Sequence, residues 1–316
     1  MTRDNFKGPW AGLPVAWTTS GQIDESTYRA DVQRCTAAGM PGVYTGGTTG
    51  EFYAMEFDEF RVIARATVEE CHAGGVPAMI GCTSTYTIGA CRRAAYAAEI
   101  GADAIQVALP FWLEIGDAQV VRFMREVADA AGGLAFSIYE TGRAKKKLTL
   151  EQHRAIKEAV PRYLMVKATA TTLGATPEGC AALSEFVNVF VSEPRWAELG
   201  PLGAAGGCSS AVYWGPRFVL GVWERVAAKD WTGAREGCAR LDGLFKFLFD
   251  TFGDRGITDT GYDRLVGVAT GFLRTSLSNR APYPYGTDED AMRVRRYCAE
   301  HLPEMLESHT PPVGVE

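Results

Sequence analysis

The stretch Tyr163-Leu164-Met165-Val166-Lys167 is a short apolar run that ends in a lysine. Its length and composition predict a buried strand with a primary amine at the strand's exit. An amine in apolar surroundings resists protonation, because desolvation disfavours the ammonium and lowers its pKa. Such a lysine can attack a carbonyl carbon. The alternative is a strand-end lysine that extends its alkyl stem into water.

Similar apolar runs recur to about residue 230 and alternate with amphipathic segments, which predicts βα units and a parallel sheet. Eight such units favour a closed (β/α)8 TIM barrel of the α/β class. An open doubly wound sheet fits less well, because the turn at residues 18–21 lacks a dinucleotide fingerprint. We expect strands near residues 11–18, 42–45, 77–82, 103–108, 134–138, 163–167, 187–191 and 206–210. The expected helices include Glu25–Ala38, Asp58–His72, Ile88–Ile100, Asp117–Ala131 and Leu150–Ala159.

Beyond Trp231 the strand signal stops and helical periodicity continues. We therefore predict a barrel catalytic domain over residues 1–230 and a C-terminal helical part over residues 231–316 that packs on the barrel. TIM barrels accept additions of this kind. The tail from Thr310 to Gly314 is expected to be frayed.

The composition, with 47% hydrophobic and 22% charged residues, is that of an ordinary soluble globular protein. A net charge of −6 with one lone basic cluster, Lys145-Lys146-Lys147, argues against a nucleic-acid partner. The N-terminus lacks an apolar signal region, and no uninterrupted apolar stretch is long enough to span a bilayer. We expect a cytoplasmic protein without a membrane anchor.

Metal and histidine chemistry are disfavoured by the pattern of their usual residues. The eight cysteines show no CxxC pair, and the four histidines fall in helical or tail segments rather than at strand exits. We expect most of the cysteines to be small buried hydrophobic residues. No metal and no cofactor are predicted.

Reactive groups of a TIM barrel stand at the carboxyl ends of its strands, where the βα loops converge. Three segments lie at such ends: the turn Gly46-Gly47-Thr48-Thr49-Gly50-Glu51, Tyr139 and Lys167. The turn offers backbone N–H groups that suit a substrate carboxylate. A plain tight turn and a core tyrosine remain the alternatives. The later small-residue stretch 203–209, with Ser209 at its end, predicts either a phosphate cradle or a wall of the pocket.

Gly47-Thr48-Thr49-Gly50-Glu51, Tyr139 and Lys167 at these spacings resemble the dihydrodipicolinate synthase/N-acetylneuraminate lyase superfamily of class I aldolase-type barrels. The resemblance covers nearly the whole chain. It implies a Schiff-base lysine at Lys167 and a proton-relaying phenol at Tyr139. It also implies that Thr48 and Thr49 bind the carboxylate of a 2-oxo acid and assist the proton relay as catalytic residues, with Gly47 beside them as a substrate contact. A homo-oligomer, a dimer or a tetramer, is a further implication, with Trp112 near a subunit interface.

Three departures from the synthase pattern bear on the substrate. Phe111-Trp112 replace two adjacent tyrosines, so no hydroxyl remains there to complete the family's proton relay. Glu140 replaces the usual asparagine, with a changed spacing to Arg143, which in synthases would bind a distal carboxylate. The segment Leu109-Pro110-Phe111-Trp112, together with Ala281-Pro282-Tyr283, looks closer to hydratase-aldolases that cleave aryl-substituted oxo acids.

The sequence therefore predicts a lyase that forms a Schiff base with pyruvate or a pyruvate-derived 2-oxo acid and catalyses aldol cleavage or condensation. Glu140, Arg143, Trp112 and Ser209 are the further expected substrate contacts. The alternatives are a dehydratase or deaminase of a hydroxylated 2-oxo acid, a dihydrodipicolinate synthase, and a catalytically silent barrel that binds a 2-oxo acid.

Overall fold

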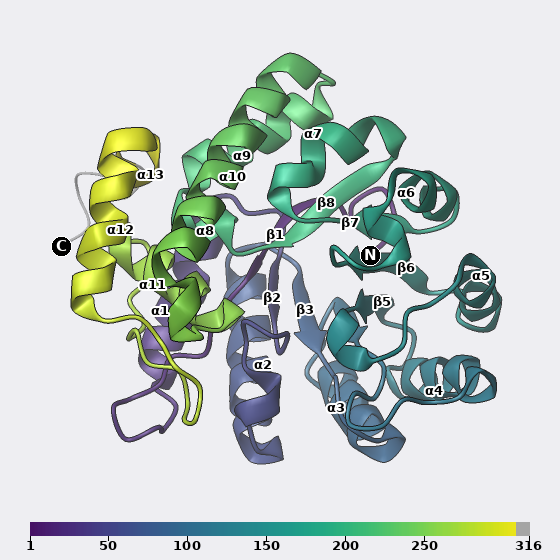
Figure 1. The fold of residues 1–316 in the computed structure, drawn as a ribbon. Helices are drawn as coiled ribbons and strands as arrows, with labels where there is room; N and C mark the ends of the chain where they lie inside the picture. Colours follow the sequence, from purple (N-terminus) through teal and green to yellow (C-terminus); the bar gives the residue numbers. More distant parts are fainter. Residues whose placement is uncertain (308–316) are drawn as a thin grey trace.

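The structure, a computed structural model, describes residues 1–307, so the predicted frayed tail and His309 lie outside the described residues. Its centre is a closed barrel of parallel strands that follow one another in chain order (Figure 1). The predicted (β/α)8 TIM barrel is confirmed. The strands are β1 (Gly8–Gly12), β2 (Val43–Thr45), β3 (Ala78–Gly81), β4 (Ala104–Val107), β5 (Ala135–Glu140), β6 (Tyr163–Ala168), β7 (Asn188–Phe190) and β8 (Ala204–Ser209).

Helices cover the outside of the barrel, and the five expected from the sequence begin and end within one residue of their predicted bounds. Side chains set several of these ends: Asp24 accepts from the Thr27 N–H at 3.0 Å, and Thr149 forms a capping box with Gln152. The helices of the barrel part are α1 (Glu25–Ala37), α2 (Phe57–Ala73), α3 (Thr87–Glu99), α4 (Asp117–Ala130), α5 (Leu150–Ala159), α6 (Pro177–Ser184), α7 (Trp196–Leu199), α8 (Ala211–Trp214) and α9 (Pro216–Ala227).

The predicted position of the first strand is wrong. It was expected over residues 11–18, but β1 ends at Gly12. Pro14 has no N–H to donate to a neighbouring strand, so the ladder cannot continue through it. The apolar residues that follow are buried in a loop, and Trp17 forms only an isolated bridge with Ile23.

The barrel interior is filled by its own cluster of side chains, separate from the larger core between strands and helices. Phe6 and Trp10 from the N-terminal segment lie in it with ring centroids 4.7 Å apart. Burial of side chains this large contributes about 1.5–3 kcal/mol each. Tyr44 on β2 belongs to the same interior cluster.

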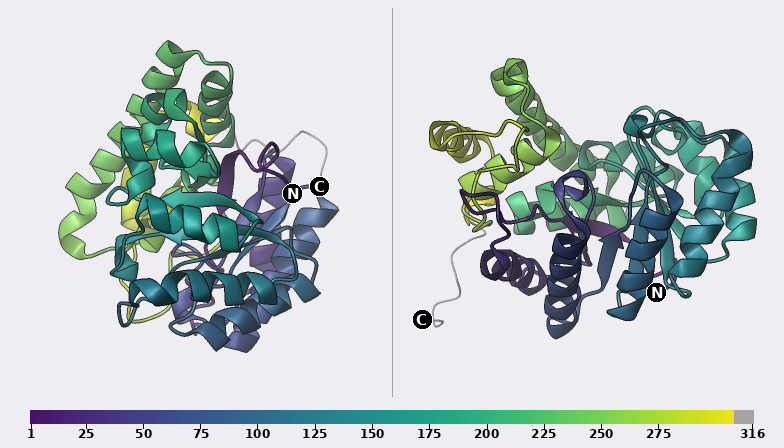
Figure 2. Two further views of the ribbon diagram at one scale, coloured as in Figure 1. Left: turned by 90° about the vertical axis from the view of Figure 1, so that its right-hand side faces the viewer. Right: turned by 90° about the horizontal axis from the view of Figure 1, so that it is seen from below.

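The chain ends in α10 (Trp231–Phe252), α11 (Asp259–Ala269), α12 (Asp288–His301) and α13 (Glu304–Glu307). These green to yellow helices lie beside the barrel (Figure 2). Contacts connect α10 with α7 and α9, and α11 with α8 and α12. The predicted helical region is therefore present, whereas its boundary at residue 230 stays a prediction. Among the described helices none is long and apolar enough to cross a membrane.

Candidate active site

Lys167 and Tyr139 stand side by side at the carboxyl ends of β6 and β5, where they are register partners. The Lys167 Nζ lies 4.0 Å from the centroid of the Tyr139 ring. Alternation along each strand turns both side chains toward the barrel axis. The amine and the phenol predicted from the sequence are thus brought together by neighbouring strands.

Two opposing effects act on the pKa of Lys167. Burial lowers it, whereas attraction to the ionised forms of Tyr139 and Tyr44 raises it, and the net direction is upward. The lowering expected from apolar surroundings stays a prediction, because the upward effect requires the phenols to be ionised. The ammonium must lose its proton before Nζ can attack a carbonyl carbon.

The turn after β2 points its two threonines at different partners. The Thr48 hydroxyl lies 3.1 Å from the Tyr139 hydroxyl, and the Thr49 hydroxyl donates to the Asp263 carboxylate at 2.5 Å. Gly46 has a φ of 72°, a left-handed conformation that glycine adopts without strain. The turn is therefore connected both to the phenol and to α11.

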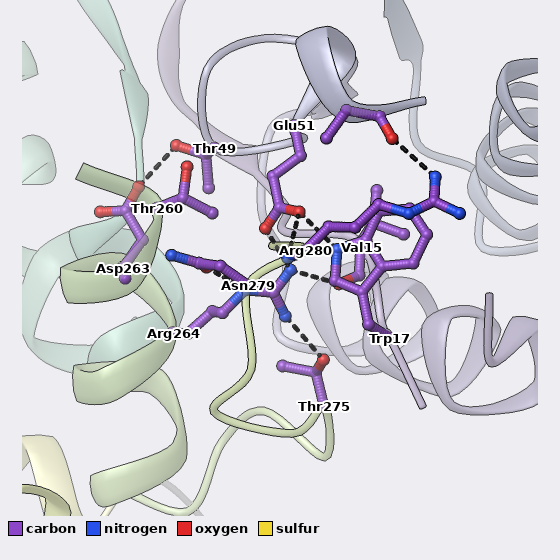
Figure 3. Close-up of polar contacts among 12 residues, drawn as sticks. Val15, Trp17, Thr49, Glu51, Thr260, Asp263, Arg264, Thr275, Asn279 and Arg280 are labelled. Carbon is purple, nitrogen blue, oxygen red and sulfur yellow. Dashed lines mark hydrogen bonds and ion pairs between the residues drawn. The ribbon is translucent and has the colours of Figure 1, made fainter. Parts of the chain in front are cut away.

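Glu51, the last residue of the turn, is buried and forms an ion pair with Arg264 of α11 at 2.7 Å. Its carboxylate also accepts from the Trp17 indole (Figure 3). Arg264 in turn donates to the Val15 carbonyl and to Thr275. Pairing with hydrogen bonds on every side is what makes buried charges tolerable. The turn, the loop after β1 and the C-terminal helices are joined at this pair.

A cavity of about 220 Å³ opens over Thr48 and Tyr139. Most of its wall is apolar or aromatic, and Arg143 provides a charge. The aromatic residues that line it are Phe52, Tyr53, Phe111, Tyr139 and Tyr283. Of these, Phe111 and Tyr283 belong to the two segments whose sequences resemble those of hydratase-aldolases. The expected aromatic wall exists, but Tyr283 and Phe52 take the place expected for Trp112.

Three predicted contacts lie elsewhere. The Glu140 carboxylate is buried behind β5, where it accepts from the Leu148 N–H at 3.0 Å and lies 3.3 Å from His153. Strand alternation causes this, because Tyr139 points inward and the next residue outward. Trp112 is 73% exposed on the loop after β4. Ser209 is buried and donates to Glu193. These positions correct the expected contacts of the three side chains with substrate.

Arg143 does line the cavity, and its guanidinium forms an ion pair with Asp259 at 3.0 Å. Both side chains are more than half exposed, at 59% and 55%. Such pairs contribute about 0–1 kcal/mol, so a substrate carboxylate could replace Asp259 at little cost. The predicted role of Arg143 toward an acidic substrate stays a prediction.

Asp263 is a candidate that the sequence did not indicate. Burial raises its pKa, and the negative charges of Asp259 and Glu193 raise it further, while hydrogen bonds from Ser210 and Thr49 lower it; the result is about 7. A lone aspartate in the middle of a helix 214 residues from Thr49 carries no local motif. In the described part of the chain, no group of His, Cys, Asp or Glu is arranged to hold a metal ion.

Comparison with known proteins shows to which family the chain belongs. Residues 5–268 match the dihydrodipicolinate synthetase family. The chain belongs to this family. Over 246 residues it is 27% identical to the 4-hydroxy-tetrahydrodipicolinate synthase of Rhizobium meliloti (strain 1021), covering 77% of this chain and 83% of that one. The predicted family and the predicted class of Schiff-base lyase are supported.

Two further similarities are informative. The trans-O-hydroxybenzylidenepyruvate hydratase-aldolase of Pseudomonas aeruginosa is 29% identical over 153 residues, and the match spans about half, 46%, of each chain. The crystal structure of dihydrodipicolinate synthase from Aquifex aeolicus superposes with a TM-score of 0.83 at 21% identity, over 93% of this chain and 98% of that one. The second likeness concerns the fold.

We expect Glu51→Gln to lower the free energy of unfolding by about 3–5 kcal/mol, because it leaves the buried Arg264 charge without its partner. Glu126→Gln is the matched control, since Glu126 pairs with Arg122 at a position where the two side chains are 38% and 73% exposed. The control should cost at most about 1 kcal/mol. Urea denaturation measures both, and equal losses would contradict the structural role of the pair.

Asp263→Asn should reduce the dependence of stability on pH. Because the folded-state pKa of about 7 lies above that of an exposed aspartate, the folded protein binds more protons than the unfolded chain between about pH 4 and 7. The free energy of unfolding therefore falls as pH rises through this window. In urea denaturation, the free energy of unfolding of the variant should rise relative to that of the wild type between about pH 4 and 7. That of Asp4→Asn, at a 99% exposed side chain, should not. A parallel pH course for wild type and Asp263→Asn would contradict this.

Proposed function

We propose that the protein is a lyase that binds pyruvate or a pyruvate-derived 2-oxo acid as an imine on Lys167. The observation that carries the proposal is the 4.0 Å contact between the Lys167 amine and the Tyr139 ring, at a cavity where Thr48 meets the Tyr139 hydroxyl. Membership of the dihydrodipicolinate synthetase family supports the same chemistry.

The residues suggest how an aldol cleavage would proceed. Unprotonated Nζ adds to C2 of the oxo acid, and loss of water leaves a protonated imine. When the C4 hydroxyl loses its proton, the C3–C4 bond breaks, its electrons enter the imine to form an enamine, and an aldehyde leaves. The enamine takes a proton at C3, and water at C2 releases pyruvate and the amine. Tyr139, supported by Thr48, is placed to carry the proton.

The lining of the cavity supports a substrate with an aryl or other apolar group beyond C4. Phe52 and Phe111 contact each other with ring centroids 5.7 Å apart, and Tyr53 and Tyr283 do so at 4.9 Å. An apolar group gains from burial against such rings, and an aromatic one gains further from edge contacts. An unsaturated aryl oxo acid would first take up water at C4, as in a hydratase-aldolase.

Arg143 favours a second candidate, an acidic substrate such as that of a synthase or a sugar-acid lyase. Its guanidinium lines the same cavity, and a guanidinium binds carboxylates well in paired geometry. Dehydration or deamination of a hydroxylated 2-oxo acid and binding without turnover remain the alternatives. We also propose a homo-oligomer, because Trp112 and Leu113 are adjacent and 73% and 74% exposed, an apolar surface that a partner subunit would cover.

Incubation with pyruvate and borohydride should leave a reduced pyruvyl adduct on the peptide that contains Lys167, detected by mass spectrometry. The reduction converts the reversible imine to a stable amine, so it reports on covalent chemistry directly. Lys167→Arg should abolish the adduct, because a guanidinium does not form the imine. Lys145→Arg, at a neighbouring surface position, should retain it. An adduct on a different lysine, or none in the wild type, would overturn the assignment.

A coupled assay for pyruvate release across aryl, sugar-acid and dicarboxylic 2-oxo acids should favour the aryl compounds. Phe111→Ala should lower kcat/KM for them by about tenfold or more, the scale of lost apolar contacts in a pocket. Phe249→Ala, at a 61% exposed position on α10, is the control and should leave it unchanged. Activity on diacids alone, lost in Arg143→Ala and retained in Phe111→Ala, would instead favour the second candidate.

A further inference from the structure

Tyr44 carries a buried hydroxyl that forms no hydrogen bond to stabilise the described part of the fold. Its side chain projects from β2 into the barrel and is 2% exposed. Among the described residues, its phenol oxygen has no hydrogen-bond partner. Most buried polar groups are paired, because an unpaired one costs about 1–3 kcal/mol, so an exception calls for an explanation. A phenylalanine would fill the same space without that cost.

The phenol belongs to the layer of side chains that holds Lys167. In a TIM barrel, alternate strands contribute the four side chains of an interior layer. Here the even-numbered strands supply Tyr44, Gln106, Lys167 and Cys208. The Lys167 Nζ lies 5.8 Å from the Tyr44 ring centroid, and the Gln106 amide donates to the Cys208 sulfur at 3.6 Å. Tyr44 is therefore a neighbour of the reactive amine.

The Tyr44 oxygen also lies against the turn after β2. A β-carbon at Gly47 would come within 1.3 Å of this oxygen, so only glycine fits under the phenol. Gly47 is the first residue of the segment that offers its backbone to a carboxylate. Tyr44 thus has its hydroxyl against the turn and its ring near the amine, the two points that would hold the ends of a bound 2-oxo acid.

The other hydroxyls of the turn are already engaged. Thr49 donates its proton to Asp263, and Thr48 shares its hydrogen bond with Tyr139. A substrate carboxylate that reached Thr49 would also approach the Asp263 carboxyl group. Tyr44 and Thr45 both carry buried unpaired hydroxyls beside the turn, and Tyr44 is the one whose side chain lies in the barrel interior near Lys167.

We propose that Tyr44 is an additional catalytic residue, whose phenol donates a hydrogen bond to the carboxylate of the 2-oxo acid bound on Lys167. This inference rests on the proposed imine chemistry and adds the donor that recognises the substrate's carboxylate. Burial raises the pKa of Tyr44, which keeps the phenol protonated as a donor near neutral pH. The hydroxyl that is unpaired in the free protein gains its partner from the substrate.

Tyr44→Phe tests the proposal, because it removes only the unpaired oxygen. Tyr213→Phe is the matched control: this phenol is also buried and unpaired, but it lies on α8 in the core outside the barrel interior. Each protein is incubated with a concentration series of pyruvate and cyanoborohydride, and the rate of adduct formation on Lys167 is followed by mass spectrometry. Acetone is the second probe, since it offers the same carbonyl group with a methyl in place of the carboxylate. Thermal denaturation checks the folding of each variant.

We expect Tyr44→Phe to raise the half-saturating pyruvate concentration about tenfold to a hundredfold, the scale of a hydrogen bond to a charged group. Its rate with acetone and its melting temperature should not fall, and Tyr213→Phe should match the wild type with both probes. Unchanged pyruvate saturation in Tyr44→Phe would overturn the proposal. So would an equal loss with pyruvate and acetone, which would assign the phenol to the amine. Absence of any adduct in the wild type would instead refute the imine chemistry itself.

Discussion

The buried ion pair between Glu51 and Arg264 is the interaction on which the site depends. The two residues are 213 positions apart in the chain, and their contact holds the C-terminal helix α11 against the turn after β2. Glu51 adopts a left-handed backbone conformation, φ 47°, which a non-glycine residue takes up only where its surroundings hold it. The same carboxylate receives the Trp17 indole, so one side chain fixes three segments. The glutamate of the turn therefore holds the site together without touching the cavity.

The barrel supplies the second constraint, since neighbouring parallel strands place their last residues side by side. Tyr139 and Lys167 come from segments that do not adjoin in sequence, yet the register of β5 with β6 sets them opposite each other. Alternation then assigns each residue its direction. Tyr139 enters the barrel, whereas Glu140 faces α5 and meets His153. A shift of one residue along β5 would exchange the phenol for the carboxylate.

Some polar side chains at the site form hydrogen bonds within the protein, and others have an atom without a hydrogen-bond partner among the described residues. Thr48, Thr49 and Asp263 form hydrogen bonds to one another or to Tyr139, and they hold the turn in one arrangement. Tyr44 and Gln106 each keep an unpaired oxygen in the layer of Lys167. A protein that kept such groups for stability alone would gain by losing them. For Tyr44, whose ring lies 5.8 Å from the amine, the proposed bond to the substrate would supply the missing partner.

Local sequence determined the eight strands, the main helices and the amine, turn and phenol at one mouth, because periodicity and strand ends are local signals. It did not determine the direction of Glu140, the exposure of Trp112 or the end of β1 at Gly12. Asp263 and Arg264 join the site only because α11 folds back onto the turn. The partners of Thr49 and Glu51, and the absence of one among the described residues for the Tyr44 hydroxyl, depend on segments distant in sequence. So do the charges that act on the pKa of Lys167, and only the tertiary structure decided them.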